Sequence, residues 1–141
     1  SKPPQKSPQK PPQKQQVKTK VTRKAKSPSF RDHPELSELE KQLKHRSYAQ
    51  LQKLFEQHKF PRAIALIEGL AARLSQDAEV RQWQAVTYQR FGRNLIDNRN
   101  LSKARVYLKK SLRTDPHNRT LWLEVERDFR RMEHLLGRSK L

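Results

Sequence analysis

The sequence predicts an all-α fold, an array of about five to six antiparallel helices that follows a disordered basic tail. From residue 36 onward, apolar side chains recur at spacings of three, four and seven, which keeps them on one face of a helix. No segment alternates apolar and polar residues as a half-buried strand would. Turn-forming segments interrupt the helical pattern at 58–61, 97–100 and 115–118, and such short breaks predict antiparallel neighbours.

The tail stands out by its charge. The chain has 141 residues, with 32 Lys and Arg against 14 Asp and Glu, for a formal net charge of +18. Residues 1–29 hold nine basic side chains, no acidic one and six of the nine prolines. With only three aliphatic side chains, this segment cannot bury enough apolar area to offset roughly 1–2 kcal/mol of backbone entropy per residue. We therefore expect disorder over 1–31, a helical domain over 32–136 and a short C-terminal tail over 137–141.

Two functions are open for this tail. It can be a solvated linker, because Pro- and Lys-rich segments of low complexity often act as spacers. It can instead be a basic arm that contacts RNA, DNA or an anionic membrane surface. The cations that would make such contacts are Lys18, Lys20, Arg23, Lys24 and Lys26. No aromatic residue precedes Phe30, so a nucleic-acid contact of the tail would be independent of base sequence.

The first two helices are predicted on either side of the break at 58–61. Asp32 followed three residues later by Glu35, with Pro34 near the first helical position, predicts the start of the first helix. Its apolar stripe comprises Leu36, Leu39, Leu43, Leu51, Leu54 and Phe55. A second helix is predicted over 63–74, where six apolar side chains share one face.

Three further helices are predicted at 78–97, at 101–114 and after an N-cap at Asn118. The turn residues at 97–100 and 115–118 separate them. The side chains expected in their core are Val80, Trp83, Val86 or Tyr88, Phe91, Leu95, Ala104, Leu108, Ser111, Leu112, Leu121, Trp122, Val125, Phe129, Met132 and Leu136.

One pair of these helices resembles a tetratricopeptide repeat, a helix–turn–helix unit of 34 residues. In the unit 85–118, Gly92 and Ala104 occupy the positions where two helices approach closely, and Pro116 ends the second helix. Trp122 lies six residues beyond Pro116, where the Trp of a next unit belongs. The resemblance implies a stack of helical hairpins whose concave groove binds a peptide of a partner protein.

The same resemblance implies which residues line the groove. They are Gln89, Arg90, Arg93, Asp97, Glu124 and Arg127. Family members that clamp the C-terminal carboxylate of a chaperone carry a Lys and an Asn at two of these places, where this chain has Gln89 and Arg93. That clamp is therefore not reproduced, and we expect Arg90 and Arg93 to hold an acidic peptide bidentately instead.

A narrower resemblance covers residues 32–136. The segments FPRAIALIEGLAARL, EVRQWQAVTYQRFGRNLI and KARVYLKKSLRTDPHN look like the C-terminal half of cyanobacterial J-domain proteins. There a J domain, which stimulates the ATPase of a DnaK-type chaperone, precedes a polar linker and a tetratricopeptide-like region. The resemblance implies that this chain is the part of a co-chaperone that specifies client or location. His33-Pro34 is followed by Glu35, so it does not supply the His-Pro-Asp loop of a J domain.

A second basic feature lies on the helix predicted over 101–114. Arg105, Lys109 and Arg113 recur at i, i+4 and i+8, which predicts a positive stripe on the outer face of that helix. The stripe can be a solvated face, or it can contact an anionic partner such as RNA or lipid.

The composition excludes several classes of protein. Cysteine is absent, so the chain has no disulfide, no thiol nucleophile and no Cys-ligated metal. No apolar run approaches 18 residues and no signal peptide is visible, so a cytoplasmic protein is expected. The five histidines form no metal-binding pair at helical spacing, and no hydrolase or phosphate-loop motif occurs. We therefore expect no catalytic residue, metal, cofactor or small-molecule substrate.

The sequence thus favours a non-enzymatic adaptor that binds a partner protein, such as a chaperone client or a DnaK-type chaperone. Two other functions are open: a basic protein associated with nucleic acid or the ribosome, and a structural subunit of a larger complex.

Overall fold

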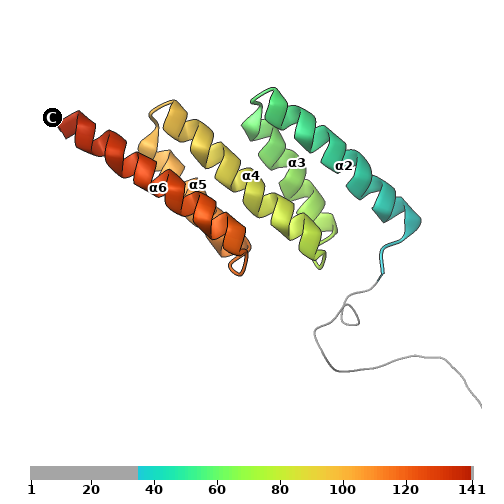
Figure 1. Cartoon of the computed structure of the whole chain (residues 1–141). Coiled ribbons are helices and arrows are strands. Elements are labelled where there is room, and N and C mark those ends of the chain that lie inside the picture. Colours follow the sequence, from blue (N-terminus) through green and yellow to red (C-terminus); the bar gives the residue numbers. More distant parts are fainter. Residues whose placement is uncertain (1–34, 141) are drawn as a thin grey trace, which may run out of the picture. The chain divides into compact units, whose positions relative to one another are not determined.

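The computed structural model describes residues 35–140, with side chains to Gly137 (Figure 1). Within that range it contains five α-helices and no strand, which confirms the all-α prediction. The helices are α2 (Glu38–Glu56), α3 (Phe60–Arg73), α4 (Ala78–Asp97), α5 (Leu101–Thr114) and α6 (Arg119–Lys140). The predicted disorder of 1–31, the tail cations and His33-Pro34 lie outside the described residues.

The first helix begins later than the sequence predicted. Glu35 and Leu36 are not helical, and α2 begins at Glu38 after the N-cap Ser37. Ser37 Oγ accepts a hydrogen bond from the Glu40 amide at 3.1 Å, and Glu40 Oε1 accepts one from the Ser37 amide at 2.9 Å. This capping box satisfies two terminal amides reciprocally, which explains why it starts the helix in place of the pair Asp32 and Glu35.

α3 begins three residues earlier than predicted and ends one residue earlier. Pro61 lies in its first turn, where a missing amide hydrogen leaves no helical bond unmade. In the turn before it, His58 has φ 57°, which ends α2 sharply. The buried stripe of α3 comprises Phe60, Ala63, Ile64, Ile67 and Leu70.

α4 and α5 have the predicted bounds. Asp77 Oδ1 accepts from the Val80 amide at 3.0 Å and caps α4. α4 is the central helix, because it packs against α3, α5 and α6. Gly92 of α4 lies directly against Leu108 of α5, which confirms the expected close approach of the two helices.

α6 follows the predicted N-cap, since Asn118 Oδ1 accepts from the Leu121 amide at 3.0 Å. Leu121, Val125 and Met132 are buried as expected. The prediction that Trp122 and Leu136 lie in the core is wrong. Leu136 is 39% exposed, and Trp122 is 46% exposed with its Nε1 donating to the Pro116 carbonyl at 2.8 Å. Among the described residues no helix packs against this side of α6.

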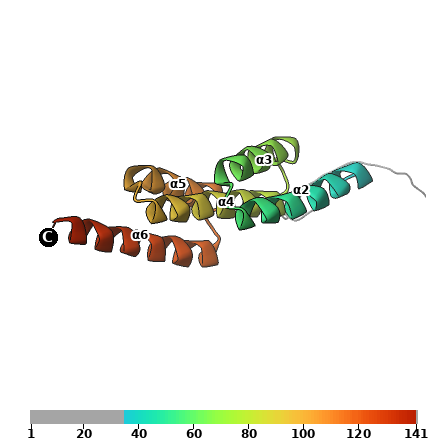
Figure 2. The same cartoon turned by 90° about the horizontal axis from the view of Figure 1, so that it is seen from above.

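The unit Ser37–Leu141 is built from two layers (Figure 2). α2, α4 and α6 lie side by side in one layer, and α3 and α5 form the other. The core between the layers contains Phe60, Ile64, Ala85, Tyr88, Phe91, Leu95, Ile96, Ala104, Leu108, Leu121, Val125 and Met132. None of the described helices combines the length and the apolar character that crossing a bilayer requires.

Candidate functional site

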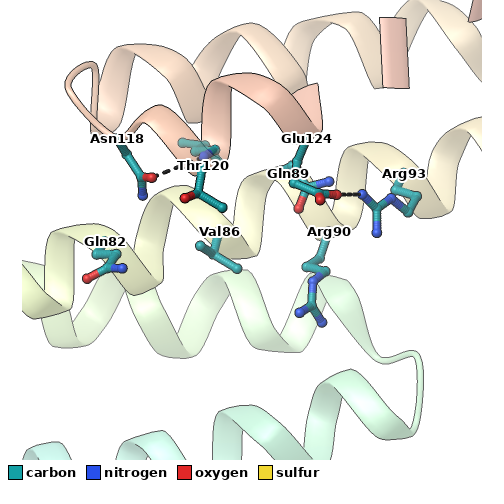
Figure 3. Close-up of a pocket in the computed structure, with 9 residues that line it drawn as sticks. Gln82, Val86, Gln89, Arg90, Arg93, Asn118, Thr120 and Glu124 are labelled. Atoms are coloured by element: carbon teal, nitrogen blue, oxygen red, sulfur yellow. Dashed lines mark hydrogen bonds and ion pairs between the residues drawn. The ribbon is translucent and has the colours of Figure 1, made fainter. Parts of the chain in front are cut away.

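A groove opens between α4 and α6, within the layer of three helices (Figure 3). Its volume is about 480 Å³. The residues that line it are Gln82, Val86, Gln89, Arg90 and Arg93 from α4, with Asn118, Thr120, Leu121 and Glu124 from the cap and first turns of α6. Four of the six predicted groove residues therefore share one concavity: Gln89, Arg90, Arg93 and Glu124.

A polar network fixes one end of this groove. Asp128 of α6 is only 3% exposed, and its carboxylate accepts from Gln89 Nε2 at 2.7 Å and from Arg93 Nε at 3.1 Å. A second nitrogen of Arg93, Nη2, forms an ion pair with Glu124 (Figure 3). Both partners of Asp128 come from α4, so the network joins α4 to α6 and sets their register.

The electrostatics of the network follow from these contacts. The hydrogen bond from Arg93 holds the pKa of Glu124 below its ordinary value, and the positive charges of Arg127 and Arg90 act in the same direction. Burial favours a lower pKa for Arg93, but its bond to Glu124 and the attraction of Asp128 outweigh burial and raise that pKa. Arg93 is thus bound by two carboxylates of α6 and forms part of the wall.

Arg90 occupies a different environment from Arg93. From Trp83 to Ile96 it is the one exposed residue of α4, because the other sides of this central helix are covered. The Arg90 guanidinium carbon lies 5.2 Å from the centre of the Phe55 ring, and Arg90 forms no ion pair with a described residue. Arg90 therefore contributes to the lining of the groove, while its guanidinium extends from α4 toward α2 and away from α6, with its charge available (Figure 3).

The two remaining predicted residues lie outside the lining. Asp97 is paired with Arg131 Nη1 at 2.6 Å, near the C-terminal end of α4. Arg127 is exposed on α6, one turn after Glu124. Of the three arginines predicted to line the groove, the structure leaves Arg90 and Arg127 without an ion pair among the described residues and pairs Arg93 with Glu124 and Asp128.

The sequence interpretation did not identify Asp128 as a buried carboxylate. The signal that could have found it is its register. Asp128 lies seven residues after Leu121 and between Val125 and Met132, on the same apolar stripe. A carboxylate at such a position must have a partner, because burying an unpaired charge is costly.

The second basic feature is found where it was predicted. Arg105, Lys109 and Arg113 are exposed on α5, and none forms an ion pair with a described residue. Over the described part of the chain, no three His, Cys, Asp or Glu side chains gather as a metal site would require. His45, His58, His117 and His134 are all exposed.

The chain was also compared with known proteins. No family model, no curated protein and no solved structure matches it. The function is therefore argued from the residues and their geometry.

Proposed function

We propose that the helical unit is a non-enzymatic, tetratricopeptide-like interaction domain that binds an acidic peptide segment of a partner protein in the groove between α4 and α6. The observation that carries the proposal is that Arg90 is exposed and forms no ion pair with a described residue. It is the one exposed side chain in the middle of an otherwise covered helix, and it lies on the wall of a concavity of about 480 Å³.

The packing of α4 against α5 supports the repeat assignment. Ala104 is fully buried, and Gly92 lies so close to Leu108 that a Cβ on the glycine would be 2.8 Å from Leu108 Cδ2. These are the small residues at which two helices of a hairpin cross most closely. The alternation of hairpin helices between two layers gives the array one face lined only by α2, α4 and α6.

The charge of the groove supports an acidic ligand. Arg90 and Arg93 of the lining, and Arg127 beside it on α6, lie near two carboxylates, those of Glu124 and Asp128, which leaves a net +1. Because Arg93 already binds both carboxylates, the excess charge resides on Arg90 and Arg127. A guanidinium binds a carboxylate through two parallel hydrogen bonds, so these two arginines suit two acidic side chains of an extended peptide.

The biological setting forms part of the same proposal. The resemblance to cyanobacterial J-domain proteins favours a cytoplasmic co-chaperone, in which this unit selects a client or a location. The groove would then bind a segment of the client or of the chaperone system.

The experiment is a peptide selection followed by a charge swap. A displayed library of random peptides is selected on the full chain, and the enriched peptides are measured by fluorescence anisotropy. We expect enrichment of Asp and Glu, and a loss of about tenfold in affinity for Arg90→Glu, which corresponds to about 1.4 kcal/mol. A peptide with Lys in place of the acidic residue should recover affinity for the Arg90→Glu chain.

Arg62→Glu is the matched control, because Arg62 is exposed on α3 in the other layer and undergoes the same change of charge. It should leave peptide affinity unchanged. Equal affinity of the wild-type and Arg90→Glu chains for every selected peptide would overturn the groove assignment.

A further inference from the structure

The two layers of the helical unit differ in charge. α3 and α5 carry seven Lys and Arg against one Glu, a net +6. α2, α4 and α6 carry thirteen against nine, a net +4, although they contain more than twice as many residues. Positive charge is therefore concentrated on the layer formed by α3 and α5 (Figure 2).

The one acidic residue of this layer is neutralised within the chain. Glu68 Oε2 accepts the hydroxyl hydrogen of Tyr88 at 2.6 Å and lies 3.8 Å from Lys110 Nζ. α5 itself has five basic residues and no acidic residue. The outer face of α5 thus presents cations without a compensating carboxylate.

The α5 cations form two groups. Arg105, Lys109 and Arg113 are exposed, and none pairs with a described acidic residue. Lys103 Nζ lies 5.6 Å from the centre of the Phe91 ring, and Lys110 Nζ lies 4.8 Å from that of Tyr88. These rings hold the two lysines at one edge of the face by cation–π contact, and Lys110 is also paired with Glu68, so the uncompensated charge of the face resides mainly on Arg105, Lys109 and Arg113.

We propose that the outer face of α5 binds the phosphate backbone of duplex nucleic acid without reading its base sequence. Arg105 and Arg113 are eight residues apart, about 12 Å along the helix axis. Over that length one strand of a duplex presents about three phosphates. Three unpaired cations along that length can each contact one phosphate, and like-charged neighbours at i and i+4 repel one another until an anion binds.

The side chains of this face argue against other partners. Protein interfaces have an apolar core and are depleted in Lys, whereas the one large apolar side chain exposed on α5 is Val106. A helix lying in a membrane surface needs Trp, Phe or Leu on its buried face, and no exposed residue of α5 is one of these. A single strand needs exposed aromatic rings for stacking, which the exposed residues of α5 also lack.

The experiment compares two triple variants of the full chain. Arg105, Lys109 and Arg113 are changed to Gln in the test variant. Arg46, Arg81 and Arg130 are changed to Gln in the control, because they are exposed on α2, α4 and α6, the three helices of the other layer, and are not ion-paired with described residues. Both variants lose three charges and keep the basic tail, so tail binding contributes equally to both.

The readout is the dependence of affinity on salt, measured by fluorescence anisotropy with a duplex DNA, a duplex RNA of the same sequence and vesicles of phosphatidylcholine and phosphatidylserine. Three lost phosphate contacts should reduce the slope of log affinity against log salt by about 2.7 on duplex DNA. The control variant should retain most of the wild-type slope. A reduction on one duplex alone supports the proposal and assigns DNA or RNA as the ligand.

Two results would overturn the proposal. Equal slopes for the two triple variants would mean that binding follows net charge and not the face of α5. Weakened binding of the test variant to vesicles with unchanged binding to both duplexes would mean a membrane partner.

Two controls verify that the variants are intact. Gln keeps a high helix propensity, and unchanged helicity by circular dichroism verifies that the variants fold. An acidic peptide selected on the groove between α4 and α6 should bind both triple variants with the same affinity as it binds the wild type.

Discussion

Asp128 on α6 accepts a hydrogen bond from Gln89 on α4 at 2.7 Å, and both side chains are only 3% exposed. The pair is polar, lies at the contact of two neighbouring helices, and is completed by Arg93, whose Nε lies 3.1 Å from the same carboxylate. α6 therefore packs on α4 through a satisfied buried network in addition to the apolar side chains of its stripe.

Removing the carboxylate should destabilise the unit. In Asp128→Ala, Gln89 and Arg93 lose their shared acceptor while remaining largely covered, so the free energy of unfolding should fall by about 2–3 kcal/mol. Urea unfolding monitored by circular dichroism measures this loss. Asp97→Ala removes a largely exposed ion pair with Arg131 and should cost less than about 1 kcal/mol. Similar losses in the two variants would contradict the structural role of the network.

Gly92 tests the close approach of α4 and α5. A Cβ at this position would lie 2.8 Å from Leu108 Cδ2 and 2.9 Å from its Cγ, inside contact distance. Gly92→Ala should therefore destabilise the unit by about 1–3 kcal/mol, although Ala has the higher helix propensity. A Cβ on Gly69 of α3 would meet no atom within 4 Å, so Gly69→Ala should stabilise the unit by about 0.5–1 kcal/mol. Thermal unfolding of both variants verifies the opposite signs.

Tyr88 gives the unit an alkaline pH dependence. Burial and the hydrogen bond to Glu68 raise the pKa of Tyr88 to about 12. Because this exceeds the ordinary value of about 10, the stabilisation is complete below pH 10 and is lost as pH rises through 12. The difference in unfolding free energy between wild type and Tyr88→Phe should fall by about 2–3 kcal/mol over this window. Urea unfolding of both chains from about pH 9 upward measures it, and a constant difference would contradict the assignment.

Capping and turn residues predicted the helix bounds well wherever only one capping signal was present. The turns at 97–100 and 115–118 each combine chain-breaking residues with a capping side chain, and α4 and α5 have the expected ends. At the start of α2 two capping signals compete within a few residues. The capping box of Ser37 and Glu40 starts the helix, and sequence alone could not rank it above Asp32 and Glu35.

The sequence predicted four of the residues that lie in the groove, but it could not predict which of them form hydrogen bonds and ion pairs with one another. The repeat spacing placed Gln89, Arg93 and Glu124 on facing helices, where the structure has them. Which of them bind one another depends on how α6 crosses α4, and that geometry is set by packing between residues some 30 positions apart, such as Arg93 and Glu124. Trp122 shows the same limit, because its exposure depends on whether another helix covers α6.

Lys109→Glu should stabilise the helical unit. Lys109 lies four residues after Arg105 and four before Arg113, so the wild-type α5 has two repulsive i, i+4 pairs that this change converts into attractive pairs. With about 0.2–0.5 kcal/mol for each repulsion removed and for each attraction formed, the gain over the two pairs should be about 0.8–2 kcal/mol at low ionic strength. It should decrease at about 1 M salt, where the Debye length is about 3 Å. Thermal unfolding at the two salt concentrations measures the effect.

Arg130→Glu is the matched control, because it changes the net charge by the same amount but places a new carboxylate beside Glu126 and Glu133 on α6. It should destabilise slightly, so the two variants separate local pairing from the relief of overall repulsion in a chain of net charge +18. A loss of stability in Lys109→Glu would contradict the argument. If Lys109→Glu gains stability while weakening duplex binding, the wild-type charges of α5 reduce stability and favour binding, the trade-off expected of a functional surface.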